Sequence, residues 1–200
     1  METPTIMPSI YLIGFMGSGK SSIGKKLSNL LHFDFVDTDA EIEQRTGKSI
    51  AQIFDVGEEH LFREQERTLI AELSQRDNIV VATGGGTPCY FDNMQRMNEN
   101  GLTIYIHANP KILTQRLIKQ KSKRPLLQNI PDESLELHIA EMLFQRGHYY
   151  CQSQITVEAF NITAKKLMEV ITYQSSPTPP PVPSTQAASY SLPNFRNSKG

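Results

Sequence analysis

Five short apolar runs recur along the chain. They lie at residues 10–13, 33–36, 79–82, 103–106 and, more weakly, 154–157. Their length and their β-branched and aromatic residues predict strands, and the segments between them carry apolar residues at helical spacing. Strands that alternate with helices are typical of a parallel sheet with helices on both faces. The pattern therefore predicts an α/β protein.

Three of the intervening segments carry apolar stripes that predict helices. The stripe after the first strand comprises Ile23, Leu27, Leu30 and Leu31. The stripe in 58–76 comprises Phe62, Leu69 and Leu73, and the one in 110–119 comprises Ile112, Leu113, Leu117 and Ile118. A basic run with a proline follows, and a further helix is expected from Asp132. We expect the basic run to form a mobile loop.

The first predicted strand leads into the glycine-rich segment 14–21, GFMGSGKS, which fits the pattern G-x-x-x-x-G-K-[ST] at every fixed position. Backbone N–H groups in such a loop and at the start of the next helix point at phosphate groups. We expect Lys20 to reach oxygens between the second and third phosphates and Ser21 to enter the shell of a magnesium ion. This segment predicts that the chain binds a nucleoside triphosphate.

Two carboxylates, Asp37 and Asp39, follow the second predicted strand. The carboxyl ends of parallel strands form the edge where α/β proteins bind ligands. Alternation places both side chains on one side of an extended segment. One can hold the water shell of magnesium while the other accepts a hydrogen bond from a substrate hydroxyl. The alternative, that Asp39 only caps a helix beginning at Ala40, does not account for Asp37.

Three consecutive glycines, Gly84, Gly85 and Gly86, follow the third predicted strand. Such a run is costly unless something approaches the backbone closely. A bound small molecule with hydroxyl groups is one such thing. A tight turn into Pro88, at the start of the next helix, is the alternative.

Three arginines are candidates for binding anions. Arg63 follows Glu59 by four residues, so a surface ion pair on a helix is its plain alternative. Arg146 could likewise be a cation favoured by a helix C-terminus. Arg124 lies in the basic loop, where closure would bring it near the phosphoryl group in transfer and let it stabilise the developing charge.

The composition of the chain limits which binding partners and which cellular compartment we expect. With 20 basic and 21 acidic residues, a nucleic-acid partner is not indicated. No apolar run approaches membrane-spanning length, and the first eight residues are too short and polar for a secretory signal, so we expect a cytoplasmic protein without a membrane partner. Cys89 and Cys151 lie in no C-x-x-C pattern, and we expect both to be buried or half-buried thiols.

The chain divides by composition near Tyr173. Residues 1–173 are expected to form a single domain, and 174–200 a tail rich in proline and serine. The tail cannot bury enough apolar surface to offset its ordering entropy, so we expect it to be disordered. Its proline run could also serve as a ligand for an aromatic-lined groove.

Taken in order, these motifs resemble the shikimate kinase family. The matching segments, within residues 9–150, are GFMGSGKS at 14–21, DTD at 37–39, EQRTG at 43–47, SIAQIF at 49–54, FRE at 62–64, GGG at 84–86 and RPL at 124–126. The resemblance implies a fold like that of the nucleoside monophosphate kinases: a three-layer α/β/α sandwich with a five-stranded parallel sheet. It also implies a substrate-binding subdomain at about residues 37–65 and a mobile lid at about residues 119–131.

The resemblance also implies roles for individual residues. Catalytic roles fall to Lys20, Asp39 and Arg124, with Asp39 orienting or deprotonating the attacking hydroxyl. Shikimate would be bound by Asp39, by Arg63 and Arg146 at its carboxylate, and by Gly84, Gly85 and Gly86 at its ring. The nucleotide would be bound by Gly17, Ser18, Gly19, Lys20, Ser21, Ser22, Arg124 and, over the adenine, Arg116. Magnesium would be held by Ser21 and, through water, by Asp37.

The function that the resemblance implies is phosphorylation of the 3-hydroxyl of shikimate by ATP with Mg²⁺. The products are ADP and shikimate 3-phosphate, on the route to chorismate and the aromatic amino acids, and we expect the enzyme to be a monomer. One alternative is another small-molecule kinase of the same fold, such as a gluconate kinase. A second is a nucleotide-gated regulatory protein without catalysis. A GTPase is disfavoured because no Asn-Lys-x-Asp segment occurs.

Overall fold

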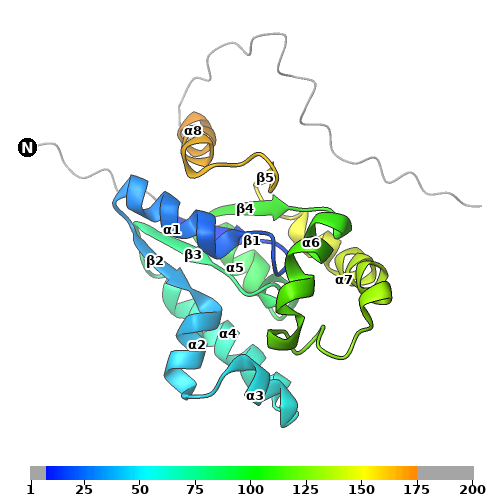
Figure 1. The fold of residues 1–200 in the computed structure, drawn as a ribbon. Helices are drawn as coiled ribbons and strands as arrows, with labels where there is room; N and C mark the ends of the chain where they lie inside the picture. Colours follow the sequence, from blue (N-terminus) through cyan, green and yellow to red (C-terminus); the bar gives the residue numbers. More distant parts are fainter. Residues whose placement is uncertain (1–7, 175–200) are drawn as a thin grey trace, which may run out of the picture.

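Five parallel strands form the central layer of the fold within residues 8–174, the part of the chain that this computed structural model describes (Figure 1). The strands are β1 (Ser9–Ile13), β2 (Asp34–Asp37), β3 (Ile79–Ala82), β4 (Gly101–His107) and β5 (Ile155–Glu158). Their order across the sheet is β2-β3-β1-β4-β5, and every neighbouring pair is parallel. All five strands lie where the apolar runs predict them, and the α/β fold is confirmed.

Helices pack on both faces of the sheet. The α-helices are α1 (Lys20–Leu31), α2 (Thr38–Thr46), α3 (Ile50–Asp55), α4 (Glu59–Leu73), α5 (Asn93–Asn100), α6 (Pro110–Leu117), α7 (Leu135–Tyr150) and α8 (Ala164–Gln174). Short 3-10 helices occur at η1 (Thr87–Cys89), η2 (Ile118–Lys123) and η3 (Asp132–Ser134). Figure 1 shows α1 and α8 on one side of the strands and α4 and α5 on the other.

The alternation of side chains along β1 explains the two faces. Ile10 and Leu12 join the apolar cluster formed with α1 and α8, whereas Tyr11 and Ile13 join the cluster formed with α4, α5 and α7. All four side chains are almost completely buried. A strand buried on both faces needs a continuous apolar run, which is what residues 10–13 provide.

The strand order fixes the place of the ligand site. From β1 the chain crosses over β3 to the edge strand β2, and from β3 it crosses back over β1 to β4. The connections therefore diverge beside β1, and such a switch point leaves a crevice at the carboxyl ends of the strands. The phosphate-binding pattern begins directly after β1, the two aspartates lie at the end of β2 and just beyond it, and the glycine triplet begins at the second residue after β3. All three motifs thus meet at one edge of the sheet.

Some helical predictions need correction. Leu30 is 48% exposed, because the sheet and α8 cover the flank of α1 that carries Leu27 and Leu31. Ile118 is 39% exposed, because the chain changes there to the tighter 3-10 helix η2 and leaves the α-helical stripe. The helix expected from Asp132 begins as η3, and α7 starts at Leu135.

The cysteines differ in their surroundings. Cys89 is half-buried, as expected, and burial raises the pKa of its thiol to about 11. Cys151 is exposed, so that expectation was wrong. It directly follows Tyr150, which points into the core, so the chain turns the next side chain outward.

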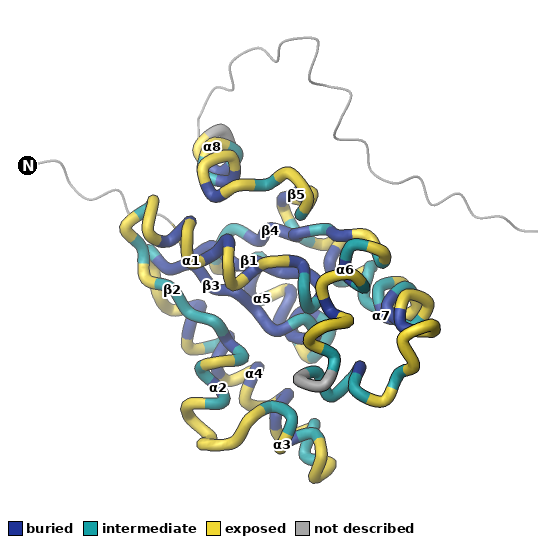
Figure 2. Tube along the Cα trace, in the orientation of Figure 1, coloured by how far each residue is buried: buried dark blue, intermediate teal, exposed yellow. Residues whose placement is uncertain are grey.

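The ends of the predicted domain lie partly beyond the described residues. Helix α8 runs to Gln174, one residue past the expected boundary, and the predicted tail at 175–200 lies outside the described part of the chain. Within residues 8–174, no helix combines the length and apolarity needed to cross a bilayer. Figure 2 shows buried residues concentrated in the strands, while α3 and the segment between α6 and α7 are largely half-buried or exposed.

Candidate active site

A cavity of about 850 Å³ opens at the carboxyl edge of the sheet. It contains most of the residues that the sequence nominates for nucleotide, metal and catalysis. These residues are Gly17, Ser18, Gly19, Lys20, Ser21, Ser22, Asp37, Asp39, Gly85, Arg116 and Arg124. The other nominated residues, Arg63, Gly84, Gly86 and Arg146, do not line this cavity but are arranged around Asp39 and the glycine triplet, as described below.

The phosphate loop joins β1 to α1 and is shaped by its glycines. Gly17 and Gly19 adopt positive φ angles of 78° and 105°, which side chains rarely allow. The Lys20 ammonium donates hydrogen bonds to the carbonyls of Gly14 (2.8 Å) and Phe15 (2.9 Å). Lys20 thus braces the loop from within, and its contact to phosphate oxygens stays a prediction.

Two polar side chains of this loop lie deep in the protein. Burial lowers the pKa of Lys20 to about 8, and the nearby carboxylates of Asp39 and Asp37 oppose that shift. The Ser18 hydroxyl is buried and has no hydrogen-bond partner within the described residues. A buried hydroxyl without a partner is costly, so its position fits a loop that encloses an oxygen-rich ligand.

Asp37 is the last residue of β2 and Asp39 lies in the first turn of α2, so the prediction that both lie on one extended segment is wrong. The Asp37 carboxylate accepts hydrogen bonds from the backbone N–H groups of Asp39 (3.2 Å) and Ala40 (3.3 Å) and so caps α2, which begins at Thr38. The idea that Asp39 is the cap of a helix beginning at Ala40 is therefore wrong. Because Asp37 supplies the cap, the Asp39 side chain is available to the cavity.

Asp39 lies in surroundings that favour its protonated form. Its pKa is raised to about 7, chiefly by burial and then by the negative charges of Glu66 and Asp37. Lys20 and Arg124 act in the opposite direction. A carboxyl group with a pKa near neutrality is suited to exchange a proton with a substrate hydroxyl.

The glycine triplet packs directly against functional side chains. A Cβ atom on Gly84 would lie 2.5 Å from Oδ1 of Asp39, and one on Gly86 would lie 2.7 Å from Nη1 of Arg63. The Gly84 N–H donates to the Thr38 hydroxyl at 2.9 Å. Larger residues would displace these side chains, so the triplet allows the carboxylate and the guanidinium to approach one backbone segment.

The glycine triplet also forms a tight turn into Pro88, which was the alternative explanation for the three glycines. The N–H of Cys89 donates to the Gly86 carbonyl at 2.8 Å, and Pro88 lies in the first turn of η1. The turn and the close approach of side chains thus occur together.

Arg63 is buried and held by two carboxylates. It is 5% exposed, and its guanidinium pairs with Glu59 at 2.9 Å and with Glu66 at 2.7 Å. Its Cζ atom lies 4.1 Å from the centre of the Tyr90 ring. The pair with Glu59 exists, but Arg63 is not a surface residue, so the surface explanation is wrong.

Two residues behind Arg63 were missed from the sequence. Glu66 is completely buried, and its other carboxylate oxygen accepts a short hydrogen bond from the Thr87 hydroxyl. Burial raises the pKa of Glu66, while Arg63 and Thr87 oppose the shift. The spacing of three residues between Arg63 and Glu66 on a helix could have suggested the pair, but its burial depends on the packing of η1 against α4.

Arg146 offers an unused cationic donor. Its Nη1 atom is buried without a hydrogen-bond partner among residues 8–174, and its Cζ atom lies 5.6 Å from the centre of the Phe15 ring. Helix α7 continues past Gly147 to Tyr150, so Arg146 is not the final cation of the helix. A buried guanidinium N–H without a partner is suited to bind a carboxylate or phosphate oxygen.

Two further arginines, Arg116 and Arg124, line the cavity. Arg116 of α6 donates to the carbonyls of Gly17 (3.1 Å) and Ser18 (3.2 Å) and so contacts the phosphate loop. Arg124, which follows η2, is half-buried, and its charge acts on both Lys20 and Asp39. Arg124 thus lies beside the groups expected to act on the phosphoryl group.

The connection between β5 and α8 supplies another wall of the cavity, through Ala159, Ile162 and Thr163. These residues were not nominated, because their sequence carries no recognisable motif. They line the same cavity as Arg116.

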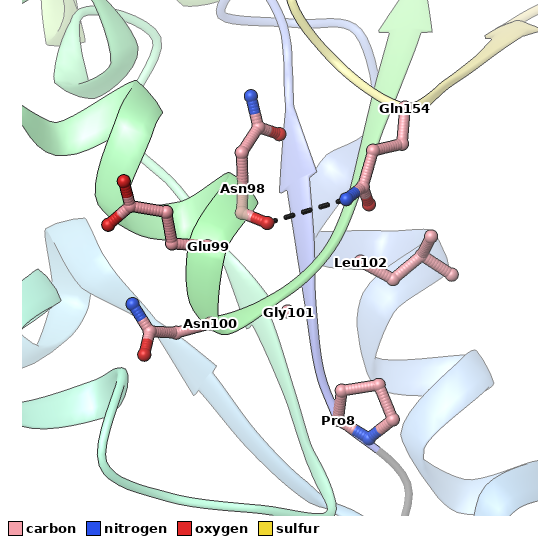
Figure 3. A pocket seen from close by; sticks show the side chains of 7 residues that line it. All are labelled: Pro8, Asn98, Glu99, Asn100, Gly101, Leu102 and Gln154. Carbon is pink, nitrogen blue, oxygen red and sulfur yellow. Dashed lines mark hydrogen bonds between the residues drawn. The ribbon is translucent and has the colours of Figure 1, made fainter.

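A second, smaller pocket of about 430 Å³ lies at the opposite edge of the sheet, near the starts of β1 and β4 (Figure 3). Its lining includes Pro8, Asn98, Leu102 and Gln154, and Gln154 donates to the Asn98 carbonyl at 3.4 Å. None of the nominated residues lines it. The chemistry is therefore concentrated at the carboxyl edge.

A phosphate loop at the switch point of a parallel sheet, with carboxylates after the edge strand and arginines over the cavity, defines a P-loop phosphotransferase. The model of the family described as shikimate kinase matches residues 16–174. The chain belongs to the shikimate kinase family.

Individual relatives agree with this assignment. The shikimate kinase of Parabacteroides distasonis is 40% identical over 153 residues, which cover 76% of this chain and 88% of that relative. The shikimate kinase of Azobacteroides pseudotrichonymphae is 40% identical over 164 residues, covering 82% and 96%.

Two solved structures are also similar to this chain. The shikimate kinase of Bacteroides thetaiotaomicron has a TM-score of 0.78 and 34% identity, with 84% of this chain and 99% of that chain covered. The shikimate kinase of Acinetobacter baumannii in complex with shikimate has a TM-score of 0.76 and 34% identity, covering 84% and 93%.

Proposed function

We propose that this protein transfers the terminal phosphoryl group of ATP to the 3-hydroxyl of shikimate, giving shikimate 3-phosphate and ADP. The observation that carries the proposal is the buried Nη1 of Arg146, which has no hydrogen-bond partner among residues 8–174, in a site that also contains Asp39 and the buried Arg63. A small polyol with one carboxylate needs cationic donors for the acid and a carboxylate for its hydroxyls.

On the acceptor side, Arg63 and Arg146 bind the substrate carboxylate, and Gly84, Gly85 and Gly86 lie against its ring. The close packing of Gly86 on Arg63 and of Gly84 on Asp39 supports this arrangement. The relative from Acinetobacter baumannii was solved with shikimate, which supports the same choice of acceptor.

On the donor side, the phosphate loop from Gly17 to Ser22 binds the triphosphate, and Arg116 lies along the adenine. The donor set also fits a magnesium ion, because Ser21 and Asp37 line one cavity and provide the oxygen ligands that this ion prefers. Bound magnesium would neutralise charge on the phosphate oxygens. Ser21 would hold it directly and Asp37 through a water molecule.

In the transfer itself, Asp39 orients the attacking hydroxyl and accepts its proton as the oxygen bonds to phosphorus and ADP leaves. Its raised pKa supports this role. Lys20 and Arg124 stabilise the charge that spreads over the transferring group. No covalent intermediate with the protein is needed, so catalysis depends on positioning and charge. Because one chain supplies every nominated residue, we propose that the monomer is active.

A coupled assay of ADP release with Mg²⁺ and ATP tests the proposal. Shikimate, quinate and gluconate are compared as acceptors for the wild type, for Asp39→Asn and for Asp34→Asn. The last is a matched control, because Asp34 is exposed and pairs with Arg76 at the far end of β2.

We expect release that depends on shikimate, persists in Asp34→Asn and falls at least about a hundredfold in Asp39→Asn. Release with gluconate alone would favour the other kinase of this fold. Nucleotide binding without release for any acceptor would favour the regulatory protein.

A further inference from the structure

The last residue of α7, Tyr150, connects two parts of the site. Its side chain is completely buried, and its hydroxyl donates a hydrogen bond of 2.6 Å to the Gly85 carbonyl. Arg146 lies four residues earlier on the same helix, so both side chains leave the same face of α7. Tyr150 therefore joins the helix that carries Arg146 to the backbone of the glycine triplet.

The triplet is fixed on more than one side. A Cβ atom on Gly85 would lie 3.0 Å from the backbone nitrogen of Met16, so Gly85 packs against the phosphate loop. The Gly84 N–H is held by the Thr38 hydroxyl of α2. The hydroxyl of Tyr150 adds an attachment to α7, through its hydrogen bond to the Gly85 carbonyl.

The role of the Tyr150 hydroxyl can be tested separately from the packing of the Tyr150 ring. The Tyr150 ring lies 5.1 Å from the Tyr105 ring, centre to centre, and belongs to the apolar cluster beneath the sheet. Phenylalanine would fill the same space and keep these contacts. What it would remove is the donor to Gly85 and the dipole beside the Arg146 guanidinium, whose positive charge acts on this hydroxyl.

We propose that Tyr150 is a positioning residue whose hydroxyl sets the separation between Arg146 and the glycine triplet, and thereby the affinity for the acceptor. The inference rests on the proposed function, in which Arg146 binds the substrate carboxylate and the triplet lies against the ring. A change in this separation weakens binding of the acceptor, whereas the Lys20 hydrogen bonds to the carbonyls of Gly14 and Phe15 continue to hold the phosphate loop.

Tyr150→Phe tests the proposal, with Tyr105→Phe as the matched control. Tyr105 is the other member of the stacked pair, and the control removes the same atom from the same core. For each protein, steady-state kinetics give the KM values for shikimate and ATP and kcat, calorimetry gives the Kd for shikimate, and thermal unfolding gives Tm.

We expect Tyr150→Phe to raise the KM and the Kd for shikimate by about tenfold, because the variant loses roughly one buried hydrogen bond. The KM for ATP should stay within about twofold of the wild-type value. Tyr105→Phe should leave both KM values within about twofold. A KM for shikimate in Tyr150→Phe within twofold of the wild type, or equal increases for shikimate and ATP, would overturn the proposal. Failure of Tyr150→Phe to fold would make the hydroxyl structural and would overturn it as well.

The wild-type arm separates this proposal from the proposed function. Absence of shikimate-dependent turnover in the wild type contradicts the function itself. Turnover in the wild type with unchanged shikimate affinity in Tyr150→Phe contradicts only the role of Tyr150.

Discussion

Replacing Asp39 by asparagine should make the protein more stable while it lowers the activity at least about a hundredfold. Burial of the Asp39 carboxyl group, together with the negative charges of Glu66 and Asp37, raises its pKa from 3.8 to about 7. Asparagine is nearly the same size but carries no charge. The variant therefore removes the cost of ionising this group in the folded protein.

The size of the gain follows from linkage. The shift of about three pKa units corresponds to about 4 kcal/mol at full ionisation, and it already includes the attraction of Lys20 and Arg124. The Asp39 residue is half-buried, so solvent screening reduces the expected gain to about 2 kcal/mol.

The sign of the pH dependence also follows from the raised pKa. Below the unfolded pKa of 3.8 the group is protonated in both states, so it imposes no cost. As the pH rises from 3.8 to about 7, the unfolded chain ionises while the folded protein keeps the proton, so the folded state loses stability relative to the unfolded state. The loss is complete once the pH has passed about 7, because both states are then ionised. The variant should therefore exceed the wild type by about 2 kcal/mol at pH 8 and by less than about 1 kcal/mol at pH 4.5.

Urea unfolding followed by far-ultraviolet circular dichroism measures this difference, since the chain contains no tryptophan. Asp34→Asn is the control, and because its ion pair with Arg76 is exposed we expect a change of no more than about 0.5 kcal/mol. An Asp39→Asn variant that is less stable than the wild type at pH 8, or a gain that does not depend on pH, would refute the reasoning.

Other consequences of the structure can be measured separately. Gly24→Ala should destabilise the protein by about 1 kcal/mol in urea unfolding, because the new Cβ would lie 2.8 Å from the Phe35 ring and this clash outweighs the better helix propensity of alanine. A variant as stable as the wild type, or more stable, would contradict the close packing of α1 on Phe35. Gly84→Ala should lower kcat/KM for shikimate at least tenfold by displacing the Asp39 carboxylate, and an unchanged value would show that the close approach is unimportant. Residues 119–131 should become protected from hydrogen exchange when ATP and shikimate bind, and equal exchange in both states would exclude a closing lid.

Much of the fold could be predicted because its signals are local. The central strands β1 and β3 are short apolar runs buried on both faces, and the phosphate loop has fixed spacing, so neither signal depends on distant residues. The start of α2 could not be assigned because Asp37 and Asp39 are equally good caps in sequence. The backbone geometry at Asp37, extended with φ −101° and ψ 115°, decides between them.

The site was predictable in its residue types but not in its surroundings. Arg63 has a candidate partner at each helical spacing, Glu59 and Glu66, yet only the packing of η1 on α4 makes the second pair buried. The bond from Tyr150 to Gly85 joins residues 65 positions apart, and no local pattern indicates it. Contacts between residues so far apart in the sequence depend on the tertiary structure, and the spacing of residues along the chain does not reveal them.

The position of the phosphate on the product tests the central claim most directly. The wild-type protein is incubated with Mg²⁺, ATP and shikimate, and the product is analysed by proton and phosphorus NMR. The account predicts a single phosphate ester whose phosphorus couples to the proton on carbon 3, because Asp39 orients that hydroxyl toward the triphosphate. A phosphate on another hydroxyl, or no phosphorylated shikimate, would contradict it.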